Sequence, residues 1–118
     1  MAGRFKLKAQ LYSGDAIAIG PGKADLLGAI DETGSISAAA RKLGMSYRRG
    51  WLLVDTMNRC WSTPLVETVV GGRKGAALSD LGRQVLADYR ALEEQLTEIE
   101  KGSAAVRLRK ALGATPPT

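Results

Sequence analysis

The side chains best suited to bind a ligand in this chain are two neighbouring arginines near the middle of the sequence. Arg48 and Arg49 follow Ser46, at the predicted start of a helix over residues 47–60. An arginine can hold a guanine base or a phosphate through two parallel hydrogen bonds. Successive helical residues point about 100° apart, so we expect one arginine to contact a base and the other a phosphate.

Other candidate contact residues lie close to this pair. Ser37 and Ser46 are expected at helix starts, where free backbone N–H groups favour phosphate, although each serine could serve simply as a helix cap. Tyr47 could donate a hydrogen bond to a phosphate or pack at the edge of the core. Either Leu52 or Leu53 could touch thymine methyl groups, and either could pack internally.

Composition argues against catalysis and favours a polyanionic partner. The chain has no histidine and one cysteine, Cys60, so it lacks the commonest general base and the residues of a cysteine-rich zinc site. We therefore expect no enzymatic activity, no metal and no cofactor. The net charge is +5, and residues 35–78 hold seven basic but two acidic side chains. Such a basic zone is typical of nucleic-acid-binding domains.

Two helices joined by a tight turn must position the arginines. Ser37 is expected to cap a short helix over residues 38–43, and Ser46 to cap the longer helix over residues 47–60. Gly44 can adopt the left-handed backbone that ends the first helix and turns the chain. This arrangement predicts a helix-turn-helix. One face of the second helix is expected to anchor it to the core through Gly50, Trp51, Val54 and Met57.

Flanking segments complete the predicted domain. Residues 4–12 alternate between apolar and polar side chains, which predicts a half-buried strand. Residues 22–33 carry apolar side chains at helical spacing, and Gly34 is expected to end that helix. The fold class expected is therefore mainly α with a small β component.

A β-hairpin is predicted after the second helix. The segment 66–70 is rich in β-branched residues, and a glycine-rich tip over residues 71–75 contains Arg73 and Lys74. A flexible basic tip directly after a helix-turn-helix is typical of a wing. We expect Arg73 and Lys74 to contact phosphates regardless of base sequence.

A long helix over residues 80–101 is expected to close the domain, which we place at residues 1–101. Its apolar side chains repeat every three or four residues. One small domain can cover the first half of this stripe, and the remainder predicts a homodimer. Residues 102–118 are expected to form a flexible tail, although part of it could extend the helix. The predicted dimer interface comprises Leu81, Val85, Tyr89, Leu92, Leu96 and Ile99.

Two runs of the sequence resemble a known family. GSISAAARKLGMSYRRGWLLVDTMNR (residues 34–59) and LVETVVGGRKGAALSDLGRQVL (residues 65–86) are similar to the N-terminal DNA-binding domain of ModE-type molybdate-responsive regulators, and more distantly to LysR-type regulators. The resemblance implies a winged helix-turn-helix that dimerises through its first and last helices and binds operators of molybdenum-related genes. The family's molybdate-binding domains have no counterpart in these 118 residues, so molybdate binding by this chain is not expected.

These observations together predict a homodimeric transcriptional regulator, a repressor, that binds double-stranded DNA. No secretion signal or membrane-spanning stretch is evident, so a cytoplasmic protein is expected. The alternative is a winged-helix protein-interaction module that does not bind DNA. The steep loss of affinity with rising salt that marks DNA binding would distinguish the two.

Overall fold

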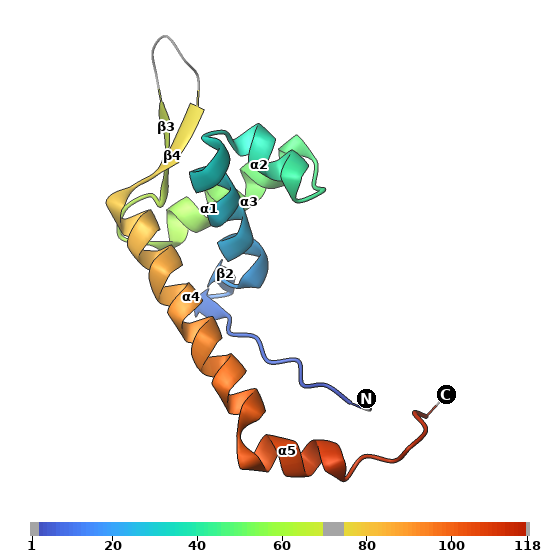
Figure 1. The fold of residues 1–118 in the computed structure, drawn as a ribbon. Coiled ribbons are helices and arrows are strands. Elements are labelled where there is room, and N and C mark those ends of the chain that lie inside the picture. Colours follow the sequence, from blue (N-terminus) through green and yellow to red (C-terminus); the bar gives the residue numbers. More distant parts are fainter. Residues whose placement is uncertain (1–2, 70–74, 118) are drawn as a thin grey trace.

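The computed structural model describes residues 3–69 and 75–117. In chain order the elements are β1 (Leu11–Ser13), β2 (Ala16–Ile19), α1 (Pro21–Thr33), α2 (Ile36–Lys42), α3 (Tyr47–Cys60), β3 (Val66–Val69), β4 (Gly75–Leu78), α4 (Asp80–Lys101) and α5 (Ser103–Lys110). The predicted fold class, mainly α with a small β component, is confirmed. Figure 1 shows α1, α2 and α3 gathered beside the first half of the long helix α4.

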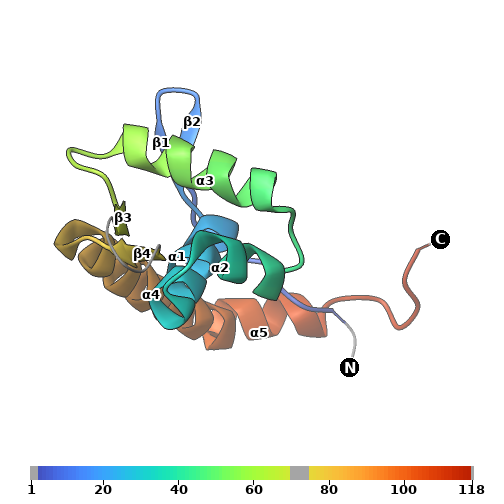
Figure 2. The same cartoon turned by 90° about the horizontal axis from the view of Figure 1, so that it is seen from above.

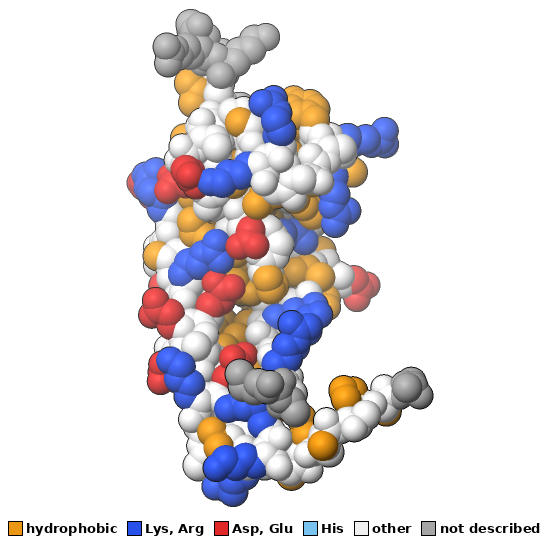
Figure 3. Space-filling model, turned by 45° about the vertical axis from the view of Figure 1, so that its right-hand side comes forward, with side chains coloured by type: hydrophobic (Ala, Val, Ile, Leu, Met, Phe, Trp, Pro, Cys, Tyr) orange, Lys and Arg blue, Asp and Glu red, His pale blue; other side chains and the backbone are white. Residues whose placement is uncertain are grey.

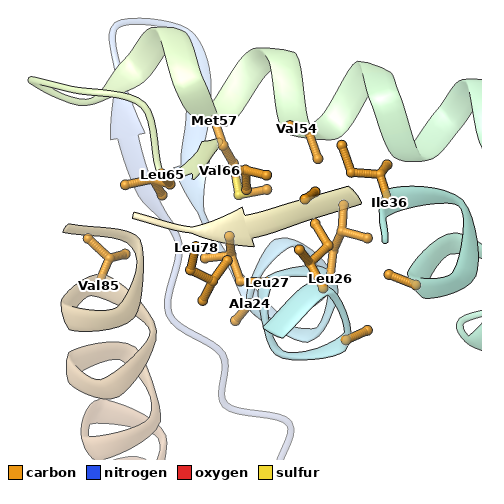
Figure 4. Close-up of a cluster of buried hydrophobic side chains, with 14 of the residues drawn as sticks. Ala24, Leu26, Leu27, Ile36, Val54, Met57, Leu65, Val66, Leu78 and Val85 are labelled. Carbon is orange, nitrogen blue, oxygen red and sulfur yellow. The ribbon is translucent and has the colours of Figure 1, made fainter. Parts of the chain in front are cut away.

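One apolar core joins α1, α3, the β3–β4 hairpin and the start of α4 (Figure 4). Full burial of a large aliphatic side chain contributes roughly 1.5–3 kcal/mol, so this core fixes how α3 is rotated relative to the other elements. Its largest fully buried side chains are Leu26, Leu27, Ile30, Val54, Met57 and Leu65.

Glycines end the first two helices, as the sequence predicted. Gly34 has a φ of 73°, and its N–H donates to the Ile30 carbonyl at 2.8 Å. Gly44 has a φ of 72° in the turn between α2 and α3. This left-handed backbone is strained for residues with a Cβ. Gly50 allows a close helix crossing, because a Cβ added there would lie 3.0 Å from the Ala40 Cβ.

The start of α2 differs from the prediction. Ser35 caps this helix, with its Oγ accepting a hydrogen bond from the Ala38 N–H at 3.1 Å. The expectation that Ser37 caps a helix beginning at residue 38 is therefore wrong. The helix starts earlier because Ile36 is 4% exposed and packs in the core, which places the last extended residue at Ser35.

The β3–β4 hairpin is tied to α3 at its base and to the end of α1 further along β4. Its strands are antiparallel, and Val66 pairs with Leu78. The Asn58 side chain, from the last turns of α3, accepts from the Leu65 N–H at 2.9 Å and donates to the Val66 carbonyl at 3.1 Å. The Ala76 N–H donates to the Gly34 carbonyl at 2.9 Å. These bonds hold the hairpin in a set direction from α3.

The predicted strand over residues 4–12 is largely wrong. Regular pairing in this region is limited to the short β1–β2 hairpin, whose register joins Leu11 to Ile19 and Ser13 to Ala16. The preceding residues have no neighbouring strand and run beside α4, where the Tyr89 hydroxyl donates to the Ala9 carbonyl at 2.8 Å. Alternating side chains form a strand only where they pair with another strand, and none of the described strands pairs with the residues before Leu11.

The long helix forms as predicted, and a further helix follows it. Ser79 caps α4, its Oγ accepting from the Gly82 N–H at 3.0 Å. The chain bends at Gly102 into α5 (Figure 1). The segment from residue 102 was expected to be flexible, yet residues 103–110 are helical. The Arg109 guanidinium donates to the Glu100 carbonyl at 2.9 Å and lies 5.4 Å from the centre of the Phe5 ring, which ties α5 back to its neighbours.

Gly82 packs directly against the backbone of Leu65 at the base of the hairpin. A Cβ at this position would lie 2.2 Å from the Leu65 carbonyl oxygen, so the Gly82→Ala variant must push α4 away from the base of the hairpin. We expect its free energy of unfolding to fall by about 1–3 kcal/mol, measured by urea denaturation. Gly28→Ala is the matched control in α1, where the added Cβ meets an Arg90 guanidinium nitrogen at 3.5 Å. It should instead gain about 0.5–1 kcal/mol. Equal stability of the two variants would contradict this packing.

Candidate nucleic-acid interface

The start of α3 stands free of the protein's own core. Ser46 caps the helix, with its Oγ accepting from the Arg49 N–H at 3.1 Å. Tyr47, Arg48 and Arg49 in the first turn are all exposed. Neither Arg48 nor Arg49 forms an ion pair with any residue in 3–69 or 75–117. Two cationic groups are therefore available to a ligand at a helix start.

The opposite face of α3 is buried. Gly50 and Val54 pack inward together with Met57, which is 0% exposed. The same spacing places residues 47, 48, 51, 52 and 55 on the outer side. A helix anchored along one side presents the other as a rigid surface, and Figure 2 shows α3 lying at the outer edge of the helical group.

Trp51 corrects the predicted division between these faces. It was expected to anchor α3 to the core, but it remains 37% exposed, with its ring packed edge-on against Tyr47 at a centroid distance of 6.1 Å. The core position is taken by Gly50, whose small size lets α2 approach. Leu53 packs against the core and Leu52 is 57% exposed, so the structure settles which leucine faces outward.

Basic and acidic side chains are distributed unevenly between the α2–α3 side of the domain and α4. The last turn of α2 adds Arg41 and Lys42, and Lys42 pairs with Glu32. On α3, Asp55 is neutralised by Arg59 at 2.9 Å. Figure 3 shows Lys and Arg side chains over the upper right part of the molecule, whereas Asp and Glu side chains alternate with Lys and Arg along its left flank. Residues 80–101, which form α4, carry six acidic and three basic side chains. A polyanion would therefore be attracted to the α2–α3 side and repelled from α4.

The remaining predicted contact residues are the two serines at helix starts and the two cations of the wing tip. Ser46 lies at the start of α3 as expected, and its hydroxyl is already used as a cap. Ser37 lies in the first turn of α2, half-buried, with its Oγ 3.1 Å from the Ser35 Oγ. Phosphate contact by either serine stays a prediction. Arg73 and Lys74, predicted at the wing tip, lie outside the described residues.

Asn58 is a positioning residue, a role that the sequence did not predict. Its side-chain amide accepts from the Leu65 and Val66 N–H groups and donates to the Val66 carbonyl, where the chain enters β3. These bonds couple the orientation of the hairpin to that of α3. An asparagine within a helix is unfavourable unless its side chain has a specific partner. An asparagine near the end of an otherwise regular helix was therefore the sequence feature that could have indicated this role.

The first part of the apolar stripe of α4 is used by the chain's own core, so Val85 and Tyr89, predicted in the dimer interface, are buried within one copy. Val85 and Tyr89 are 8% and 4% exposed, and Leu81 packs partly against the core. Burial, followed by the nearby Glu93 charge, raises the pKa of the Tyr89 hydroxyl, which stays protonated as a donor. Further along, Leu92 is 40% exposed and Leu96 is half-buried.

The exposed end of the stripe borders an apolar groove. This groove has a volume of about 330 Å³ and lies between the β1–β2 hairpin and α4. Leu11, Ile19, Trp61, Val85 and Leu92 line it. Ile99, two turns beyond Leu92, is 59% exposed. Leu92 and Ile99 therefore form an exposed apolar strip on the second half of α4.

Other kinds of site find little support in the described residues. No group of three or more Cys, Asp or Glu side chains in 3–69 and 75–117 is placed to hold a metal ion. Across the same residues, no helix has the length and apolar character needed to traverse a bilayer.

The capped helix pair, the outward-facing α3 and the hairpin that follows it define a winged helix-turn-helix domain. A solved structure of similar fold is the DNA-binding domain of CbnR in complex with DNA, with a TM-score of 0.58 and 22% identity. The match covers 72% of this chain and 94% of that domain. No known protein-family model matches the chain.

Relatives of higher sequence identity include ModE proteins. The chain is 41% identical to the molybdenum transport protein ModE of Azotobacter vinelandii, over 94% of this chain and 40% of that protein. It is 40% identical to the molybdenum-pterin-binding protein MopB of Rhodobacter capsulatus, over 69% and 31% of the two chains, and 34% identical to the DNA-binding transcriptional dual regulator ModE of Escherichia coli, over 63% and 29%. Over most of its length this chain is thus homologous to the ModE-type molybdate-responsive regulators, as the resemblance predicted. It spans less than half the length of these relatives.

Proposed function

We propose that this chain is the DNA-binding part of a transcriptional regulator and not an enzyme, with the start of α3 in the major groove and the β3–β4 hairpin beside the phosphate backbone. The observation that carries the proposal is the exposed pair Arg48 and Arg49 at the capped start of a helix whose other face is buried. The N-terminal residues of a recognition helix are the ones that reach base edges. Because the core already holds α3 in place, binding does not have to offset the entropy lost in ordering this helix.

The relatives support a narrower proposal about the target genes. One of them is named a molybdenum transport protein and another a DNA-binding transcriptional dual regulator. We propose that the operators bound by this chain control genes of molybdenum handling. Arg73 and Lys74 remain proposed wing contacts to phosphate on the strength of the sequence.

We also propose a homodimer formed through the second half of α4. Leu92 and Ile99 lie seven residues apart, so they share one face of the helix; both are exposed, and Leu92 also lines the apolar groove. A second copy would cover this strip with an identical one, as two-fold interfaces do. Two copies would also present two α3 helices to the two half-sites of a palindrome.

The second candidate function is a protein-interaction module. The same exposed strip around Leu92 and Ile99 favours it, because a different partner protein could cover these side chains. Such docking would be apolar and only weakly sensitive to salt, whereas DNA binding releases counterions.

Salt dependence tests the proposed function. Duplexes would be selected from a random pool and the affinity of the best one measured by fluorescence anisotropy. If the dimer makes six or more phosphate contacts, its affinity should fall by about 10³-fold or more between 50 and 200 mM salt. A protein that selects no duplex, or an affinity that does not change with salt, would reject DNA binding in favour of the interaction module.

A further inference from the structure

The outer face of α3 carries an apolar strip beside its arginines. We define the α3 strip as Tyr47, Trp51 and Leu52, whose exposed fractions are 57%, 37% and 57%. These three residues, with Arg48 and Asp55, line one shallow hollow on the helix surface. Three large apolar side chains turned outward together are unusual in a domain that has a well-filled core.

The geometry of the strip matches the part of α3 proposed to enter the groove. Residues 47 to 55 span about 12 Å along a helix axis, close to the width of the major groove. Asp55, which shares this face, is already paired with Arg59 at 2.9 Å, so its charge opposes phosphate less. The strip would thus lie against base edges with a cation next to it.

The major groove offers few partners for apolar side chains. Base edges there are donors and acceptors, with the exception of the 5-methyl group of thymine. Building on the proposed function, we propose that Trp51 and Leu52, with Tyr47 supporting the Trp51 ring, recognise thymine methyl groups, and that the α3 strip selects thymine next to the base or phosphate held by Arg48. The sequence reasoning allowed a methyl contact by Leu52 or Leu53; the structure excludes Leu53, which packs inward, and adds Trp51.

Replacing thymine by deoxyuridine tests this inference, because the exchange removes the methyl group and keeps every hydrogen-bonding atom. Each thymine of the selected duplex would be exchanged in turn and the affinity of the wild-type protein measured. At one or more positions we expect a loss of about fourfold, the factor for one methyl-sized group withdrawn from water. Trp51→Ala or Leu52→Ala should bind the thymine and deoxyuridine duplexes alike at those positions.

Matched variants guard against indirect effects. Leu108→Ala removes a leucine that is 62% exposed on α5, and this variant should keep the full loss on deoxyuridine exchange. Circular dichroism would check folding. Since Leu52 is 57% exposed, Leu52→Ala should fold and keeps the test open even if Trp51→Ala unfolds.

The outcomes separate this inference from the proposed function. If the wild-type protein binds a selected duplex in a salt-dependent way but no exchange of thymine for deoxyuridine lowers the affinity, the thymine inference fails and DNA binding stands. If both alanine variants keep the wild-type loss, another part of the protein contacts the methyl groups and the inference also fails. If no duplex is bound, the proposed function fails first.

Discussion

Replacing Arg48 or Arg49 by alanine is expected to weaken binding to the selected duplex by about 1–3 kcal/mol if that arginine reads a base. The structure gives the reason, since both guanidinium groups are exposed at the start of α3 and neither is held by a described acidic group. The helical twist points them in different directions, so their effects should differ in kind. One variant should relax the preference at a single base pair.

The other arginine is expected to act on phosphate. Its alanine variant should weaken binding to all duplexes by a similar factor and lower the salt slope by about one. Comparing the two variants on the selected duplex and on single-base mutants, at several salt concentrations, assigns the roles of Arg48 and Arg49. Sequence preference and salt slope are independent readouts, so the assignment does not depend on affinity alone.

Arg107→Ala is the matched control for both variants. Arg107 is also exposed, but it lies on α5 at the other end of the molecule from the hairpin (Figure 1). Its loss removes the same charge and should leave the base preference unchanged. If Arg48→Ala and Arg49→Ala both fold and bind like the wild type, α3 does not enter the groove.

A double change on α4 is expected to have the second large effect. The variant Leu92→Glu with Ile99→Glu should sediment at the monomer mass of 12.5 kDa, whereas the wild type should sediment at twice that value. Unpaired carboxylates would otherwise be buried in the interface, where desolvation is strongly unfavourable. Operator affinity should fall by about 10²–10⁴-fold, because linked binding to two half-sites is lost.

The exposed positions of both residues make this experiment interpretable. Leu92 and Ile99 are 40% and 59% exposed in one copy, so charges there should leave the urea midpoint of the monomer unchanged. Leu108→Glu on α5 introduces the same charge at another exposed leucine and should leave the dimer intact. A wild-type monomer, or a double variant that still dimerises, would show that the face of α4 with Leu92 and Ile99 is not a dimer interface.

Local features of the fold were predictable because their interactions stay within a few residues. Ser46 and Ser79 each cap a helix through an N–H three residues ahead, and Gly34 ends α1 through a carbonyl four residues back. Such contacts depend on residue type and spacing, both of which are visible in a chain. They placed α3, α4 and the outward start of α3 correctly.

Features that depend on distant neighbours were predicted less well. The alternation in residues 4–12 could not reveal that residues 4–10 would have no strand beside them, and that Tyr89, 80 residues beyond Ala9, would bind the Ala9 carbonyl instead. The cap of α2 moved to Ser35 because the core had room for Ile36. Each outcome depends on which surface is available nearby.

The printed residues were thus enough to define the helix-turn-helix, the caps of α3 and α4, the basic zone and the resemblance to ModE-type regulators. Folding in three dimensions settled how α3 is rotated: Gly50 faces α2, whereas Trp51 turns outward beside Leu52. The physical reason is that hydrophobic spacing defines a face to within about one residue, and close packing against a particular neighbour selects which residue occupies it.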